Sequence, residues 1–213
     1  MFDIEKLINE LTLDEKISLL TGFNSWYSNK IPRLNIPSIK MSDGPNGVRG
    51  DSTSNKSSAC FPCPISIGST WNKKLIKKVG IALGEEALDK DVDVLLGPTI
   101  NLHRHPLGGR HFENFSEDPV LTGKIAVSYV KGVQSKQVSA CLKHFVANDT
   151  EFERHTVSSN VDERTLREIY LLPFEMGVKK AQAKSVMSAY NKLNNIYCSS
   201  NKELLMDILK TEW

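Results

Sequence analysis

Short apolar runs alternate with longer amphipathic segments from residue 37 to residue 213, and this alternation limits the fold more than any other feature. The runs predict strands at residues 38–42, 64–68, 92–97, 138–142 and 185–189. The segments between the later runs carry apolar residues at helical spacing. Strands that alternate with helices predict an α/β fold, in which helices cover a parallel sheet.

Several helices have a recognisable start. Asp118 precedes Pro119, and an acidic cap followed by proline is typical of a first helical turn. Asp162 is a second expected cap, and Ser200 or Asn201 caps the last helix. Pro173 lies inside the helix that starts at Asp162 and is expected to split it in two.

Residues 1–36 have a different pattern and form an N-terminal region of helices and a loop. Ile4, Leu7, Ile8 and Leu11 have helical spacing. Thr12 and Glu15 then form a capping box for a second short helix. We therefore divide the domain into residues 1–36 and residues 37–213, the latter holding about five β/α units.

Polar residues follow four of the predicted strands at the point where each strand ends. They are Asp43, the loop around Arg110, the pair Lys143-His144, and Tyr190. The carboxyl edge of the strands is the active-site face of a β/α barrel, whereas an open doubly wound sheet binds ligands only near its switch point. Four contributing strands favour a barrel. Because a complete (β/α)8 barrel takes about 250 residues, we expect a partial, incomplete TIM-type barrel.

Composition and charge exclude several classes of function. Lys and Arg number 27 against 25 Asp and Glu, with no basic block, so no nucleic-acid partner is expected. No run approaches the roughly 20 apolar residues of a membrane helix, and the first residues do not resemble a signal peptide. We expect a cytoplasmic protein that does not bind a membrane. Cys60 and Cys63 have the C-x-x-C spacing but lack a second pair or a thioredoxin-like context.

Single residues leave alternatives open. Asp43 precedes a glycine and is also compatible with a plain turn. His103, His105 and His111 could supply metal ligands or could be solvated loop residues. Side chains of Lys143 and His144 point to opposite faces in a regular strand. Both can reach one ligand only if the backbone departs from regular extension, for example through a cis peptide.

Taken together, four motifs resemble the N-terminal barrel of family 3 glycoside hydrolases, and most closely the intracellular β-glucosidases of yeasts and other fungi. The motifs are Ser42-Asp-Gly-Pro-Asn-Gly-Val-Arg49, Leu107-Gly-Gly-Arg-His-Phe-Glu-Asn-Phe-Ser-Glu-Asp-Pro119, Lys143-His-Phe145 and Met187-Ser-Ala-Tyr-Asn191. They occur in the family order between about Leu11 and Trp213. The resemblance implies retaining hydrolysis of terminal, non-reducing β-D-glucosyl residues from a β-glucoside or small oligosaccharide, with no cofactor and no metal ion.

The resemblance also implies which residues hold the terminal sugar. The matching positions are Asp43, Arg49, Arg110, Lys143, His144 and Tyr190. A carboxylate can accept hydrogen bonds from two neighbouring hydroxyls, and the cations donate charge-assisted bonds to other sugar oxygens.

One departure from the family pattern concerns catalysis. Retaining glycosidases need a carboxylate nucleophile and a carboxyl acid/base. The family nucleophile is an aspartate in a Ser-Asp-Trp motif, and the Ser-Asp pair of this sequence, Ser42-Asp43, is followed by Gly44. We therefore assign no catalytic residue and expect both groups beyond Trp213, so that the chain alone is inactive. The alternatives are a carbohydrate-binding pseudoenzyme and a metal-dependent hydrolase that uses His103, His105 and His111.

Overall fold

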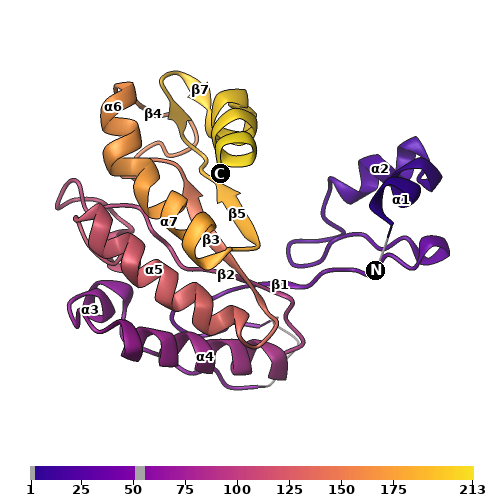
Figure 1. Ribbon diagram of the computed structural model, residues 1–213, viewed down its shortest axis with the longest axis horizontal. Helices are drawn as coiled ribbons and strands as arrows, with labels where there is room; N and C mark the ends of the chain where they lie inside the picture. The colour runs from indigo at the N-terminus through magenta and orange to yellow at the C-terminus, as the bar shows by residue number, and fades with distance from the viewer. Residues whose placement is uncertain (1–2, 51–55) are drawn as a thin grey trace.

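The fold is built on a four-stranded parallel sheet, seen in a computed structural model that describes residues 3–50 and 56–213 (Figure 1). The strands are β1 (Met41–Asp43), β2 (Val94–Leu96), β3 (Ser139–Phe145) and β5 (Ser185–Ser188). Their order in the sheet is their order in the sequence, with all neighbouring pairs parallel. A doubly wound sheet would reverse this order at its switch point. The sheet is therefore an open arc of a β/α barrel, as the sequence predicts.

One predicted strand is wrong. Residues 64–68 form a short helix, α3 (Pro64–Gly68), so the arc has four strands where five were expected. Proline is well tolerated in the first turn of a helix, where its missing N–H has no intrahelical acceptor. Pro64 and Ile67 are both buried, three positions apart, which is the spacing of one helix face.

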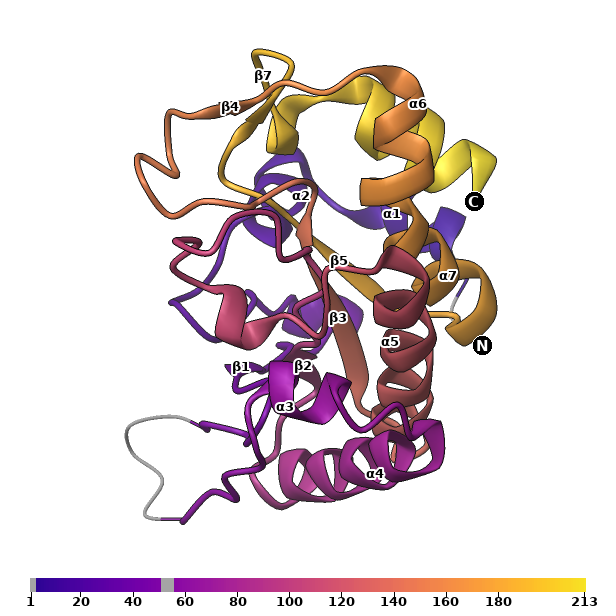
Figure 2. The same cartoon turned by 90° about the vertical axis from the view of Figure 1, so that its left-hand side faces the viewer.

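Helices on one side of the sheet cover it (Figure 2). The connections contain α4 (Lys73–Asp89), α5 (Pro119–Gln134), and the consecutive segments α6 (Glu163–Thr165), η3 (Leu166–Leu171) and α7 (Leu172–Ala181). The expected caps are present: Asp118 accepts from the Leu121 N–H at 2.7 Å, and Asp162 accepts from the Thr165 N–H at 3.0 Å.

Pro173 does not split its helix, contrary to the sequence prediction. Helical residues continue from Glu163 to Ala181, and the segment η3 before the proline has the wider turns of a π-helix. Pro173 then falls in the first turn of α7. At this position the absent proline N–H costs no hydrogen bond within α7.

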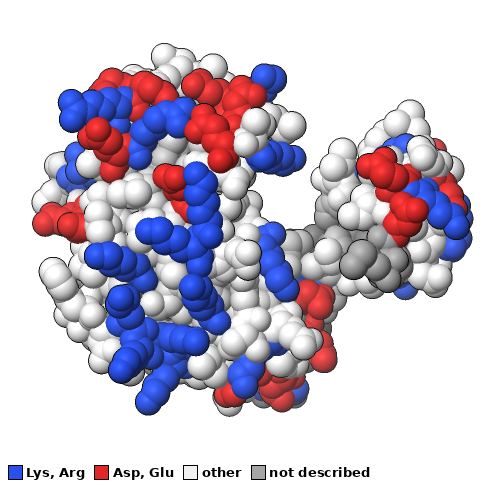
Figure 3. All heavy atoms as spheres, in the orientation of Figure 1, with Lys and Arg blue, Asp and Glu red and all other residues white. Residues whose placement is uncertain are grey.

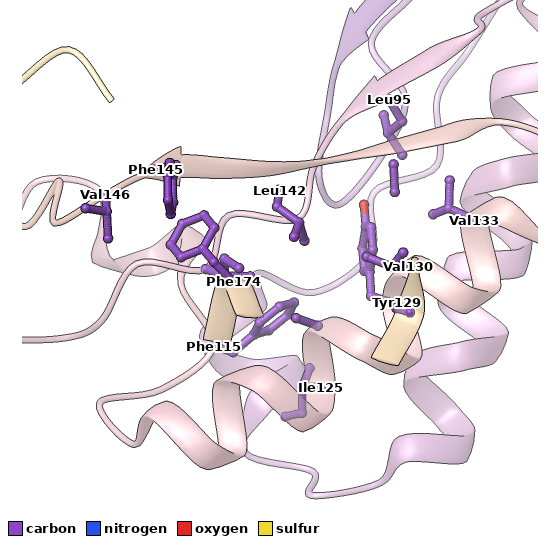
Figure 4. Packing of buried hydrophobic residues seen from close by; sticks show 14 of the residues in the cluster. Leu95, Phe115, Ile125, Tyr129, Val130, Val133, Leu142, Phe145, Val146 and Phe174 are labelled. Carbon is purple, nitrogen blue, oxygen red and sulfur yellow. The ribbon is translucent and has the colours of Figure 1, made fainter. Parts of the chain in front are cut away.

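The core lies between the sheet and these helices (Figure 4). Leu142 and Phe145 of β3 are fully buried against the helix layer, and the rings of Phe145 and Phe174 meet edge to face at 5.1 Å. The apolar side of β3 thus anchors the strand whose end carries Lys143 and His144.

Helices α4 and α5 approach closely because glycines face each other. A Cβ atom on Gly132 would lie 2.5 Å from the Lys77 carbonyl oxygen and 2.8 Å from the Gly80 Cα. We expect Gly132→Val to lower the free energy of unfolding by about 1–3 kcal/mol, since rigid backbone atoms cannot make room for the side chain. Urea denaturation measures the change. Lys131→Val places valine at an exposed site of the same helix and should cost only its helix propensity, about 0.5 kcal/mol; equal losses would contradict close packing as the cause.

The N-terminal region stands apart from the sheet and leads into β1 (Figure 1). It contains α1 (Ile4–Glu10), α2 (Leu13–Leu19) and η1 (Pro32–Leu34). The expected capping box is present, with Thr12 and Glu15 each bonded to the other's backbone N–H. No residue of α1 or α2 is buried, and Ile4, Ile8, Leu13 and Ile17 are exposed.

The last part of the chain adds elements at the end of the sheet. A small sheet that the sequence does not predict contains β4 (Ser158–Ser159), β6 (Lys192–Leu193) and β7 (Ile196–Tyr197). A short turn, η4 (Cys198–Ser200), precedes the expected final helix, η5 (Glu203–Glu212). Asn201 caps this helix by accepting from the Leu204 N–H at 3.1 Å. Among the described residues, no helix combines the length and the hydropathy needed to cross a membrane.

Candidate functional site

A cavity of about 540 Å³ opens at the carboxyl ends of the strands. Its lining residues come from all four strands or the segments that follow them: Asp43, Leu96, Arg110, Lys143, His144, Arg154, Met187, Ser188 and Tyr190. The structure therefore brings together five of the six residues that the sequence singles out, although Asp43 and Tyr190 are far apart in the chain. It does not place Arg49 among them.

Arg49 has an exposed side chain and contributes through its backbone. Its N–H donates to the Asp43 carbonyl oxygen at 2.9 Å, which closes the turn after β1. Gly44 in this turn has a φ of +122°, and a Cβ there would lie 1.8 Å from the Gly47 carbonyl oxygen. Glycine is thus required to aim the Asp43 carboxylate into the cavity.

Lys143 and His144 both line the cavity because β3 departs from a regular strand at its end. The peptide bond between them is cis, and the pairing of β3 with β5 shifts register between Leu142 and Phe145. Lys143 and His144 are each only 4 % exposed. The Lys143 Nζ lies 3.4 Å from Asp43 Oδ1, so a buried ammonium faces a half-exposed carboxylate across the cavity.

Arg110 is held in place by a carboxylate behind it. Glu113 accepts from Arg110 Nε at 2.7 Å and from Nη2 at 2.8 Å, and its Oε2 also accepts from the Thr99 hydroxyl at 3.1 Å. These bonds raise the pKa of Arg110. Burial opposes ionisation of Glu113, but the bonds and the charge of Arg110 outweigh it and lower the pKa of this carboxyl. Glu113 is therefore a fixed anion that orients the guanidinium.

His144 is a neutral imidazole. Asn101 accepts from the His144 backbone N–H at 2.9 Å and donates to its carbonyl oxygen at 2.9 Å, and the ring Nδ1 lies 3.4 Å from Asn101 Oδ1. Arg110 Nη1 lies 3.2 Å from the ring Nε2. Since a guanidinium only donates, Nε2 is assigned as the acceptor and Nδ1 carries the proton. Burial, followed by the charges of Arg110, Lys143 and Arg154, lowers the pKa of His144 to about 3.

Tyr190 and Arg154 form the outer wall of the cavity. The Arg154 guanidinium lies 5.4 Å from the centre of the Tyr190 ring, and the His155 ring lies 4.7 Å from it. Glu151 accepts from Arg154 Nη1 at 2.7 Å. Arg154 and the supporting residues Glu113 and Asn101 are not among the site residues that the sequence predicts. The signal that could have found Arg154 is its place in the polar loop that follows β3.

Comparison with known proteins agrees with this architecture. Residues 13–213 match the glycosyl hydrolase family 3 N terminal domain. The chain belongs to this family. It is 54 % identical over 212 residues to a β-glucosidase of Rhizobium radiobacter, an alignment that covers 99 % of this chain and 26 % of that protein. The family resemblance of the motifs is thereby confirmed.

Solved structures of β-glucosidases share the fold. The structure of the β-glucosidase from Kluyveromyces marxianus in complex with glucose superimposes with a TM-score of 0.97 at 48 % identity, covering 100 % of this chain and 26 % of that one. β-Glucosidase 3B from Thermotoga neapolitana in complex with α-D-glucose gives a TM-score of 0.94 at 45 % identity, with 100 % and 32 % covered. The chain thus spans about a quarter to a third of the length of these relatives.

The histidines considered as metal ligands make other contacts in this family 3 chain. His103 Nε2 lies 2.8 Å and 3.1 Å from the carbonyl oxygens of His111 and Asn114, so this nitrogen donates a hydrogen bond. His105 Nδ1 accepts from the Leu107 N–H at 3.2 Å. Within residues 3–50 and 56–213, no three His, Cys, Asp or Glu side chains form a group that could hold a metal ion. Cys60 and Cys63 are free thiols, as are Cys141 and Cys198.

Proposed function

We propose that this chain supplies the glucosyl-binding part of a retaining β-glucosidase. The observation that carries the proposal is the meeting of Asp43, Lys143, Arg110 and His144 in one cavity at the carboxyl edge of the barrel arc. The family relatives named β-glucosidase, and neighbours solved with glucose, support this assignment. A cavity of about 540 Å³ is in the size range of small-molecule sites.

The site offers complementary groups to a pyranose. Asp43 can accept from two vicinal hydroxyls, while Lys143 and Arg110 donate to the oxygens beside them. His144 is neutral, its Nε2 lies 3.2 Å from Arg110 Nη1, and its ring adds an uncharged polar surface to the cavity. Tyr190, 54 % exposed, can close over the ring or over the group attached to it.

Hydrolysis requires more than this set provides. A retaining enzyme needs a nucleophilic carboxylate and a protonated carboxyl about 5–5.5 Å apart. Asp43 is the only carboxylate among the residues that line the described cavity, and it faces the Lys143 ammonium. Glu113 lies behind Arg110 with a lowered pKa, so it remains ionised and cannot donate a proton at neutral pH. We infer that this chain binds the glucosyl residue and that the catalytic carboxyl groups come from elsewhere in the enzyme.

Two measurements on the 213-residue chain test the proposal. Saturation-transfer NMR should detect binding of methyl β-D-glucopyranoside. The matched control is methyl β-D-galactopyranoside, which differs from it in the configuration of one hydroxyl. The rate at which 4-nitrophenol is released from its β-D-glucoside should equal the rate measured in buffer without the protein. Turnover that disappears in Lys143→Met would contradict the inferred lack of a carboxyl pair, and absence of glucoside binding would contradict the binding role.

The same site is compatible with a carbohydrate-binding pseudoenzyme, the alternative supported by the single carboxylate at the cavity. The two functions differ in one test: only a β-glucosidase half-site should yield turnover when the remaining domains of a family 3 relative are supplied in trans.

We also propose a cytoplasmic location, which the four free thiols support because disulfides are rare in that compartment.

A further inference from the structure

The outer surface of the helix layer carries a concentration of positive charge that the glucosyl site does not use. Lys and Arg side chains gather over α4, α5 and α7 on the face shown in Figure 3, while Asp and Glu lie around this area, at the top, left edge and lower right of the main body, and on the N-terminal region. A groove of about 380 Å³ runs between these helices. Six lysines line it, together with Val127, Ser128 and Met176: Lys73, Lys74, Lys77, Lys124, Lys131 and Lys180. We call this surface the lysine groove.

The charge in the lysine groove is local and unbalanced. The whole chain has a formal net charge of only +2, yet no Asp or Glu lines the groove in the described part of the chain. Neighbouring lysines outside it do have acidic partners: Lys179 lies 2.9 Å from Glu175, and Lys136 lies 2.8 Å from Glu85. The six ammonium groups therefore create a positive potential along one channel.

The start of α4 strengthens this potential. Lys73 and Lys74 occupy the first turn of the helix, which contains no acidic residue. A helix N-terminus already carries partial positive charge and normally attracts Asp or Glu. Two lysines at this position oppose the stability of the helix by a few tenths of a kcal/mol each, and they favour an anion brought by another molecule.

The floor of the groove is apolar. Val127 of α5 is half-buried and Met176 of α7 is buried, and both line the groove together with the lysines. A ligand that fits both features carries several carboxylates and at least one apolar side chain that reaches between the helices.

We propose that the lysine groove is a docking site for an acidic, partly apolar segment of another protein. Lysine ammonium groups are compact point charges that pair with carboxylates without strict geometry. Nucleic-acid sites commonly add arginine or amide side chains that read bases and aromatic rings that stack on them, and none of these is found among the described residues of the groove. A bilayer presents a flat surface, whereas Met176 of the groove is only 6 % exposed and is reached better by a single side chain than by a flat surface.

Binding of a fluorescein-labelled peptide, in which pairs of glutamates alternate with leucine, tests the proposal by anisotropy on the 213-residue chain. We expect saturable binding that weakens as NaCl is raised, because salt screens exposed charges. The variant Lys77→Glu/Lys124→Glu/Lys131→Glu should bind about tenfold more weakly or worse. The milder Lys77→Gln/Lys124→Gln/Lys131→Gln should show a smaller loss, and circular dichroism should show unchanged helix content in both.

A matched control changes the same charge on other surfaces: Lys16→Glu/Lys30→Glu/Lys210→Glu, all exposed positions outside the groove. This variant should retain the wild-type affinity for the peptide. Equal losses in both triple variants, or no binding of the peptide, would overturn the proposal. It would also be overturned if heparin or phosphatidylserine vesicles bound through the groove while the acidic peptide did not.

Discussion

Replacing Lys143 with methionine should weaken the binding of methyl β-D-glucopyranoside by about ten- to a hundredfold. A hydrogen bond from a charged group contributes about 1.5–3 kcal/mol, which corresponds to this range of affinity. Methionine fills a similar volume, so the wall of the cavity stays closed. The substitution also removes the cation 3.4 Å from Asp43, and the carboxylate that should accept from the sugar loses its fixed partner. NMR titration of the chain with the glucoside measures the dissociation constant.

Lys192→Met is the matched control. Lys192 lies in β6, with its ammonium 4.8 Å from the Tyr197 ring, and it is not among the residues that line the cavity. The control should bind the glucoside as the unchanged chain does. If both variants bind equally well, the assignment of Lys143 to the glucosyl site is wrong.

The common position of the site residues could be predicted from sequence because parallel strands end at one edge. Asp43, Lys143, His144 and Tyr190 each come directly after an apolar run, so a local pattern and one rule of topology are sufficient. The helix caps could also be predicted from a local pattern, because each cap depends on residues within one helical turn.

Features that depend on distant contacts could not be predicted in this way. Arg154 reaches the cavity from a loop that begins after β3 ends, and its position depends on stacking against Tyr190. Glu113 lies three positions after Arg110, but only the fold brings Lys143 near it and places the Thr99 hydroxyl within hydrogen-bond distance of its carboxylate. The run at 64–68 alternates like a strand but is too short for periodicity to separate strand from helix.

The site is therefore an arrangement of charges that support one another. Glu113 fixes Arg110, Arg110 donates toward His144, and burial together with the cations around His144 lowers the pKa of its imidazole and keeps it neutral. Protonation of this histidine would place a third positive charge between Arg110 and Lys143 in a buried setting. The stability of the fold should then respond to pH through His144.

When the pH falls from 7 to 5, the free energy of unfolding of the unchanged chain should decrease by about 2 kcal/mol more than that of the variant His144→Gln. The folded-state pKa is about 3 and the unperturbed value is 6.5, so between these values the unfolded chain binds a proton that the folded chain does not. Stability contributed by the neutral imidazole is complete above pH 6.5 and decreases by about 1.4 kcal/mol per pH unit below it. Urea denaturation at several pH values gives the difference between the two proteins.

The difference between variants is needed because other groups titrate in the same range. Burial raises the pKa of Asp149 to about 6, so Asp149 takes up a proton in the folded chain and stabilises it as the pH falls, opposite to His144. Burial and then His103 lower the pKa of His111, which acts in the same direction as His144. Both groups are present in the chain and in His144→Gln, so their contributions cancel in the comparison. His155→Gln alters an exposed imidazole as the control; if it changes the pH dependence as much as His144→Gln does, the buried position of His144 is not the source of the effect.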